Sequence, residues 1–143
     1  MKNTVLVAMS LCAFAIITTN QTHAQAKEGG GAGHSHFIKV PATVEEIWKE
    51  IGNQQTKLAA VVAKNDLGEA HDHGYAIRDL VRALPGKVAA ESKANAEKGA
   101  AKIATLAAAI DKSSAAGAQK VTDANVKKLA TAVDALRTEL KAK

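Results

Sequence analysis

Hydrophobic residues recur every three to four positions along most of this chain, and no segment alternates apolar and polar residues with a period of two. The longer spacing places side chains on one face of a helix, whereas a half-buried strand needs the period of two. Turn-forming residues interrupt the pattern at Asn65-Asp66 with Gly68, Leu84-Pro85-Gly86, and Ser113-Ser114 with Gly117. The sequence therefore predicts an all-α protein with four helices joined by short turns.

The helices are expected over residues 44–64, 69–84 and 88–112, and from Gln119 or the Thr122-Asp123 pair nearly to the C-terminus. Thr43 and Glu46 have the spacing of a capping box. Four such helices favour an antiparallel up-down bundle, and a three-helix arrangement with one kinked break is the alternative. The residues expected in the core of the four helices are Val44, Ile47, Trp48, Ile51, Leu58, Val61 and Val62; Ala70, Gly74, Ile77, Val81 and Leu84; Ala96, Gly99, Ile103, Leu106 and Ile110; and Val126, Leu129, Val133, Leu136 and Leu140.

Two positions depart from a fully apolar core. Gln54 and Gln55 fall where the apolar face of the first helix should continue, so they form a polar layer or lie beside a narrower part of the core. The first half of the third helix offers mainly small residues on its buried face. We expect it to be the least firmly packed segment, because small side chains bury little area.

The N-terminus has the three regions of a secretory signal: Lys2, an apolar run over residues 5–17, and a small-residue site ending at Ala24. We expect a signal peptide at 1–24, a flexible Gly/His tail at 25–42, a helical bundle at 43–143, and a periplasmic or secreted protein. Cleavage after Ala26 is the second choice. The apolar run is shorter than the roughly 20 residues that span a bilayer, so we expect no stable membrane insertion.

Cleavage would remove Cys12 and both methionines, leaving a chain without sulfur. Disulfides, thiolate zinc sites and Cys-x-x-Cys-His haem attachment are then excluded. No nucleophile-elbow or phosphate-loop motif is present, so we expect a non-enzymatic protein. The basic excess lies in residues 87–143, with eleven Lys or Arg against six Asp or Glu, but no aromatic residues are interleaved to stack on bases. Nucleic acid is therefore not expected as a partner.

Four histidines remain after cleavage, in two His-x-His pairs: His34 with His36, and His71 with His73. On the extended backbone of a tail, His34 and His36 point to the same side and can chelate Cu(II), Ni(II), Zn(II) or Co(II). On a helix, His71 and His73 are about 200° apart and cannot share an ion. One of them could join the tail pair, or both could lie in a loop if the helix begins after Gly74. Otherwise His73 is a half-buried histidine, and His71 only stacks or hydrogen-bonds.

The segment His71-Asp72-His73-Gly74-Tyr75-Ala76-Ile77-Arg78-Asp79-Leu80, followed by Ala83-Leu84-Pro85, resembles part of small exported bacterial helical proteins associated with heavy-metal efflux systems. Trp48 and Lys128-Leu129 are loosely similar. The resemblance implies a setting in metal resistance, with His71 matching the pattern and His73 particular to this sequence.

Two functions are expected from these features. The first is a periplasmic metal-binding protein that uses His34, His36, His71 and His73, and buffers the ion or hands it to an envelope metal-efflux component. The only cofactor expected is that divalent transition metal. The alternative is a structural or partner-binding bundle that docks onto another envelope protein or forms a homodimer, because the alanine-rich third helix leaves a monomer little buried area.

Overall fold

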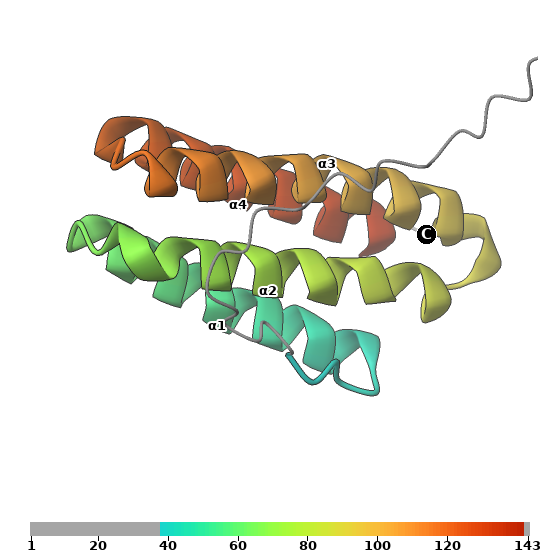
Figure 1. Ribbon diagram of the computed structural model, residues 1–143. Helices are drawn as coiled ribbons and strands as arrows, with labels where there is room; N and C mark the ends of the chain where they lie inside the picture. The colour runs from blue at the N-terminus through green and yellow to red at the C-terminus, as the bar shows by residue number, and fades with distance from the viewer. Residues whose placement is uncertain (1–37, 142–143) are drawn as a thin grey trace, which may run out of the picture. The chain divides into compact units, whose positions relative to one another are not determined.

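The computed structural model describes residues 38–141, which form four long helices (Figure 1). Helix α1 spans Val44–Ala63, α2 Ala70–Ala83, α3 Ala90–Ala115 and α4 Gln119–Lys141. Single 3₁₀ turns, η1 at Leu67–Glu69 and η2 at Leu84–Gly86, precede and follow α2. Each helix runs antiparallel to the one before it, and α1 also contacts α4 (Figure 1). The expected antiparallel four-helix bundle is confirmed, and the three-helix alternative is wrong.

The ends of the helices follow from local chemistry. The Thr43 hydroxyl accepts the backbone N–H of Glu46, and the Glu46 carboxylate accepts the backbone N–H of Thr43, both at 3.2 Å. This capping box satisfies two amide donors that the first turn of α1 leaves without helical partners. After α1, Asn65 adopts a left-handed conformation with φ of 58°, and Gly117 does the same with φ of 65° between α3 and α4. Asparagine and glycine tolerate that region best.

The third break differs from the expectation. Helix α3 continues past Lys112 and through Ser113 and Ser114, so these serines do not end it. The Ser113 hydroxyl donates to the backbone carbonyl of Ile110 at 3.1 Å, and the Ser114 hydroxyl donates to the backbone carbonyl of Asp111 at 2.9 Å. These bonds keep both hydroxyls satisfied inside a helix, where serine also forms local contacts with the preceding turn. Gly117 alone makes the left-handed turn.

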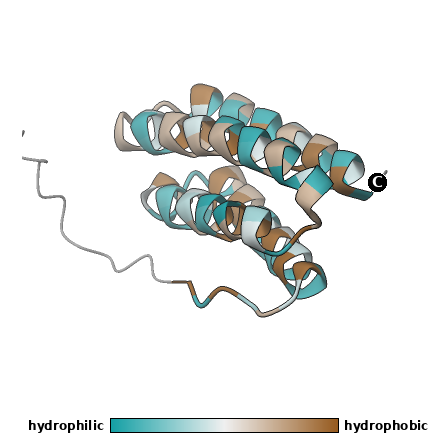
Figure 2. Ribbon diagram, turned by 90° about the vertical axis from the view of Figure 1, so that its right-hand side faces the viewer, coloured by the Kyte–Doolittle hydropathy of each residue, from teal (hydrophilic) through white to brown (hydrophobic). Residues whose placement is uncertain are grey.

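The core lies between the apolar faces of the four helices, as the alternation of hydrophobic and hydrophilic segments in Figure 2 indicates. Most of the expected core residues are buried. On α3, however, fewer large side chains are buried than expected. Gly99 and Leu106 are only partly buried there, and apart from Ile103 and Ile110 the buried residues of this face are small. On α1 and α4, Val44, Val61 and Leu140 are likewise only partly buried. The buried residues of α3 are Ser92, Ala96, Ala100, Ile103, Ala107, Ile110, Ser113 and Ser114.

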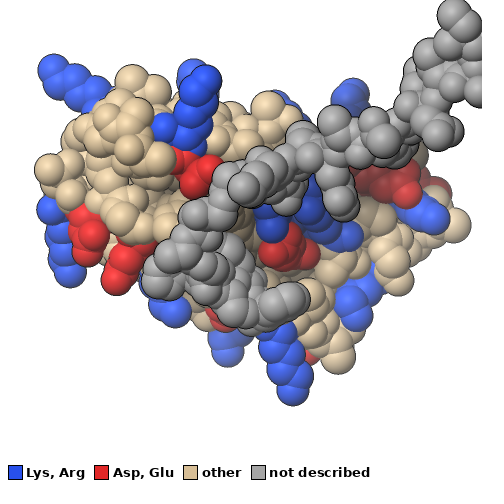
Figure 3. Space-filling view, viewed as in Figure 1, with Lys and Arg blue, Asp and Glu red and all other residues tan. Residues whose placement is uncertain are grey.

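The surface of the bundle carries charges of both signs. Lys and Arg side chains project at separate places in Figure 3, with acidic side chains between them. Among the helices of residues 38–141, none is both long enough and apolar enough to cross a membrane.

Candidate functional site

The histidines of the sequence fall into two groups in the structure. His34 and His36 lie outside the described residues. His71 and His73 lie in the first turn of α2, which begins at Ala70, so the alternative that the helix starts after Gly74 is wrong. The two rings have different partners: His71 contacts Asp72, and His73 contacts Gln54 of α1. As expected for a helix, they do not form one chelating pair.

His73, Gln54 and Glu50 form a chain of hydrogen-bonded side chains that fixes the His73 ring. Its Nδ1 lies 2.8 Å from Oε1 of Gln54, and Nε2 of Gln54 donates to Oε1 of Glu50 at 2.7 Å. Because the carboxylate of Glu50 can only accept, the Gln54 amide must present its oxygen to the histidine. An amide oxygen has no proton to donate, so Nδ1 of His73 carries the hydrogen. In the neutral ring, Nε2 therefore holds the lone pair.

The surroundings of this chain favour neutral His73 and ionised Glu50. Burial lowers the pKa of His73, and the positive charge of Lys57 lowers it further, against smaller opposing effects of Glu69 and Asp72. Hydrogen bonds from Asn53 and Gln54 lower the pKa of Glu50. The imidazole thus stays neutral around pH 7, which is the form that can bind a metal ion.

His71 belongs to a neighbouring polar cluster on α2. Its Nε2 lies 3.1 Å from Oδ1 of Asp72. One turn later, the Tyr75 hydroxyl donates to Oδ2 of Asp111 on α3 at 3.0 Å, and the guanidinium of Arg78 stacks 4.3 Å from the Tyr75 ring centre. Burial and the bond to Asp111 raise the pKa of Tyr75. This cluster ties α2 to α3 and keeps the phenol protonated.

Within residues 38–141, no three His, Cys, Asp or Glu side chains come together to hold a metal ion. His73 can therefore supply one ligand of a site there, but the described part of the bundle does not provide a complete three-ligand set. The chemistry of the α2 turn is that of a single oriented imidazole.

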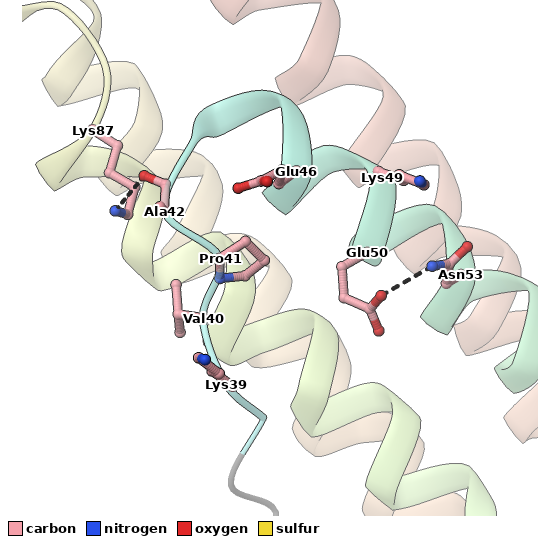
Figure 4. Close-up of a pocket in the computed structure, with 9 residues that line it drawn as sticks. All are labelled: Lys39, Val40, Pro41, Ala42, Glu46, Lys49, Glu50, Asn53 and Lys87. Carbon is pink, nitrogen blue, oxygen red and sulfur yellow. Dashed lines mark hydrogen bonds between the residues drawn. The ribbon is translucent and has the colours of Figure 1, made fainter.

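A pocket of about 650 Å³ lies where the segment before α1 meets α1 and Lys87 (Figure 4). Three of its charged side chains are already engaged in internal hydrogen bonds. Lys87 donates to the carbonyl of Ala42 at 2.8 Å, Glu46 caps α1, and Glu50 accepts from Asn53 at 2.9 Å. The lining contains neither a histidine nor a hydroxyl nucleophile, so it offers no catalytic group of the histidine or serine kind.

Sequence reasoning identified His73 and the polar position of Gln54 but did not connect them. The contact joins residues 19 apart in the sequence, across the α1–α2 hairpin, so neither helix pattern alone could reveal it. Glu50 was missed entirely, although its position one turn before Gln54 on α1 was a usable signal. Comparison of this chain with protein families, curated proteins and solved structures finds no match.

Proposed function

We propose that this protein binds a borderline divalent metal ion, Cu(II), Ni(II), Zn(II) or Co(II), in the cell envelope, and buffers it or passes it on. The ligands are His34 and His36 of the tail, with His73 as the third imidazole. His71 projects to another side of α2 than His73, so it is the alternative third ligand and does not join His73 at the same ion. Export depends on the signal peptide expected at residues 1–24.

The observation that supports this proposal best is the hydrogen bond between His73 and Gln54. Metal-binding histidines commonly donate their second ring N–H to an oxygen acceptor, which fixes the tautomer and the orientation of the ring. Gln54 plays that part here, and Glu50 in turn orients Gln54. The bond from Gln54 to Glu50 also fixes which end of the amide faces the histidine, and so which ring nitrogen keeps the lone pair.

The lowered pKa of His73 supports the same function. A metal ion competes with protons for the lone pair of imidazole, so a ring that resists protonation binds metal over a wider pH range. Nothing in the sequence indicates that His34 and His36 are buried, so we do not expect burial to protect these two rings from protonation. We therefore expect binding to weaken as the pH falls through about 6.5, the ordinary histidine value, with His73 the last of the ligands to be lost.

Calorimetric titration of untagged residues 25–143 with Cu(II), Ni(II) and Zn(II) at about pH 7.5 tests the proposal, because free imidazole is mostly neutral there. The proposal predicts one ion bound per chain with micromolar or tighter affinity. The double variant His34→Ala/His36→Ala should lose this binding. Stoichiometric binding that survives in the double variant, or no binding above that of an unrelated helical protein, would contradict it.

A further inference from the structure

A groove of about 390 Å³ lies between α3 and α4, with an apolar floor and a basic rim. Leu106, which packs against the core, and buried Ala132 form the floor. Thr131 and three lysines complete the lining, and none of the lining residues is acidic. The lysines are Lys102, Lys127 and Lys128.

Only one of these three lysines forms a salt bridge with an acidic side chain of the described residues. Nζ of Lys127 pairs with Asp123 at 2.7 Å. Among residues 38–141, Lys102 and Lys128 form no ion pair within 4 Å. The groove therefore attracts an anion, and the low polarity of its floor favours one with an apolar part.

An exposed valine lies on α4 outside the lining of the groove. Val121 is 53% exposed, the more exposed of the two large hydrophobic side chains that stand out on the described surface. It lies seven residues before Lys128, which puts both on the same side of α4 about two turns apart.

We propose that this groove binds a single-chain anionic amphiphile such as a medium-chain fatty acid. Its carboxylate lies between Lys102 and Lys128, and its chain covers Leu106 and Ala132. The volume is near the lower end of the roughly 300–1,000 Å³ of small-molecule sites, which suits one acyl chain and not the two chains of a phospholipid. None of these residues belongs to the proposed metal site, so the two proposals stand or fall separately.

Titration of residues 25–143 with decanoate at about pH 7.5, below its micelle concentration, tests the groove, with backbone amide shifts and calorimetry as readouts. We expect saturable one-to-one binding with the largest shifts in α3 and α4 around the groove. The double variant Lys102→Gln/Lys128→Gln should weaken binding about tenfold or more, because it removes both positive charges that attract the carboxylate. Thr131→Glu, which adds a negative charge at an exposed lining position, should weaken it as well.

The matched control is Lys57→Gln/Lys64→Gln, which removes two exposed lysines of the α1 region and should leave decanoate binding unchanged. Decanol, with the same chain and no charge, should bind more weakly than decanoate. The absence of saturable decanoate binding would overturn the proposal, as would equal loss of affinity in the two lysine double variants. Binding to anionic phospholipid vesicles without binding to decanoate would also overturn it, and would assign this face to a membrane surface.

Discussion

Gln54 fixes the orientation and the tautomer of the half-buried His73 ring, so that Nε2 holds the lone pair that can bind a metal ion. Its amide accepts from one side and donates to the other, so His73 and Glu50 are both fixed by a single side chain. The residue is itself buried, at 8% exposure, and the two hydrogen bonds offset the cost of burying its amide. Of the two glutamines that the sequence suggested for a polar layer, Gln54 is buried and hydrogen-bonded, whereas Gln55 is only partly buried.

Replacing Gln54 by methionine tests this role because methionine has a similar volume and cannot accept a hydrogen bond as the amide does. The affinity for Zn(II) should fall about ten- to a hundredfold, the range found when second partners of metal-binding histidines are removed. Gln55→Met, one residue along the same helix, is the matched control and should bind as the wild type does. Calorimetry gives both affinities, and equal affinities for the two variants would argue against the role of Gln54.

Protonation of His73 should make folding depend on pH. Burial and Lys57 lower its pKa in the folded state, so the unfolded chain binds a proton at this residue more readily. The stability that neutral His73 contributes is therefore complete above about pH 6.5 and is lost as the pH falls from there through the lowered pKa. Urea unfolding between about pH 5 and 7.5 should show less stability on the acid side. His73→Asn retains a donor for Gln54 but does not titrate, so its pH slope should be smaller; identical slopes in both proteins would refute this.

At the scale of single residues, the sequence showed which side chains could bind a metal but not how they are held. His-x-His spacing is visible in any sequence, whereas the bond from His73 to Gln54 exists only because α1 and α2 pack in one particular register. The directions in which His71 and His73 project were predictable, since they depend only on helix geometry.

Among the helices, Gly99 of α3 packs directly against the side chain of Leu136 on α4. A Cβ at this position would lie 2.5 Å from Cδ1 of Leu136, closer than side-chain atoms can pack. Gly99→Ala should therefore destabilise the protein by about 1–3 kcal/mol, although alanine is the better helix former. Thermal or urea unfolding measures the loss.

The control is Gly52→Ala in α1, where a Cβ would meet nothing within 4 Å. Helix propensity alone should make this variant more stable, by up to about 1 kcal/mol. Leu136→Ala in the Gly99→Ala background removes the clash, so the double variant should lose less than the sum of its single changes. A stabilising Gly99→Ala would show that the two helices do not pack as described.

The first half of α3 remains the segment that we expect to open most easily. Its buried side chains before Ile103 are Ser92, Ala96 and Ala100, all small. Local opening there exposes little apolar area, so its amides should exchange with solvent faster than those of the second half of the helix. Native-state hydrogen exchange followed by NMR measures this directly. Uniform protection along α3 would contradict the expectation.

At the scale of elements, helix periodicity and turn residues were sufficient to place all four helices. The capping box at Thr43 and the proline-glycine pair after Leu84 were predicted correctly because each acts on the backbone within a few residues of its own position. The end of α3 was predicted too early. Its two serine hydroxyls bond to preceding backbone carbonyls, so the helix continues through residues that usually indicate a stop. Between α3 and α4, the residue with a positive φ is Gly117, and the chain turns there.

At the scale of the whole described bundle, the two proposed binding sites lie in separate regions. The oriented histidine lies between α1 and α2, and the lysine-rimmed groove lies between α3 and α4. The fold could be predicted because four amphipathic helices with short connections have few ways to bury their apolar faces. The function could be predicted only as far as a ligand set, since two of its four histidines lie outside the described residues.

The most direct test of the proposed metal site is nitrogen NMR of the histidine rings in residues 25–143 during titration with Zn(II). Without metal, His73 should carry its proton on Nδ1 and the lone pair on Nε2. On addition of one equivalent, Nε2 of His73 should shift together with ring nitrogens of His34 and His36, while Nδ1 of His73 keeps its proton. If the tail rings shift and His73 does not, or if His73 carries its proton on Nε2, the bundle does not contribute the ligand that this account assigns to it.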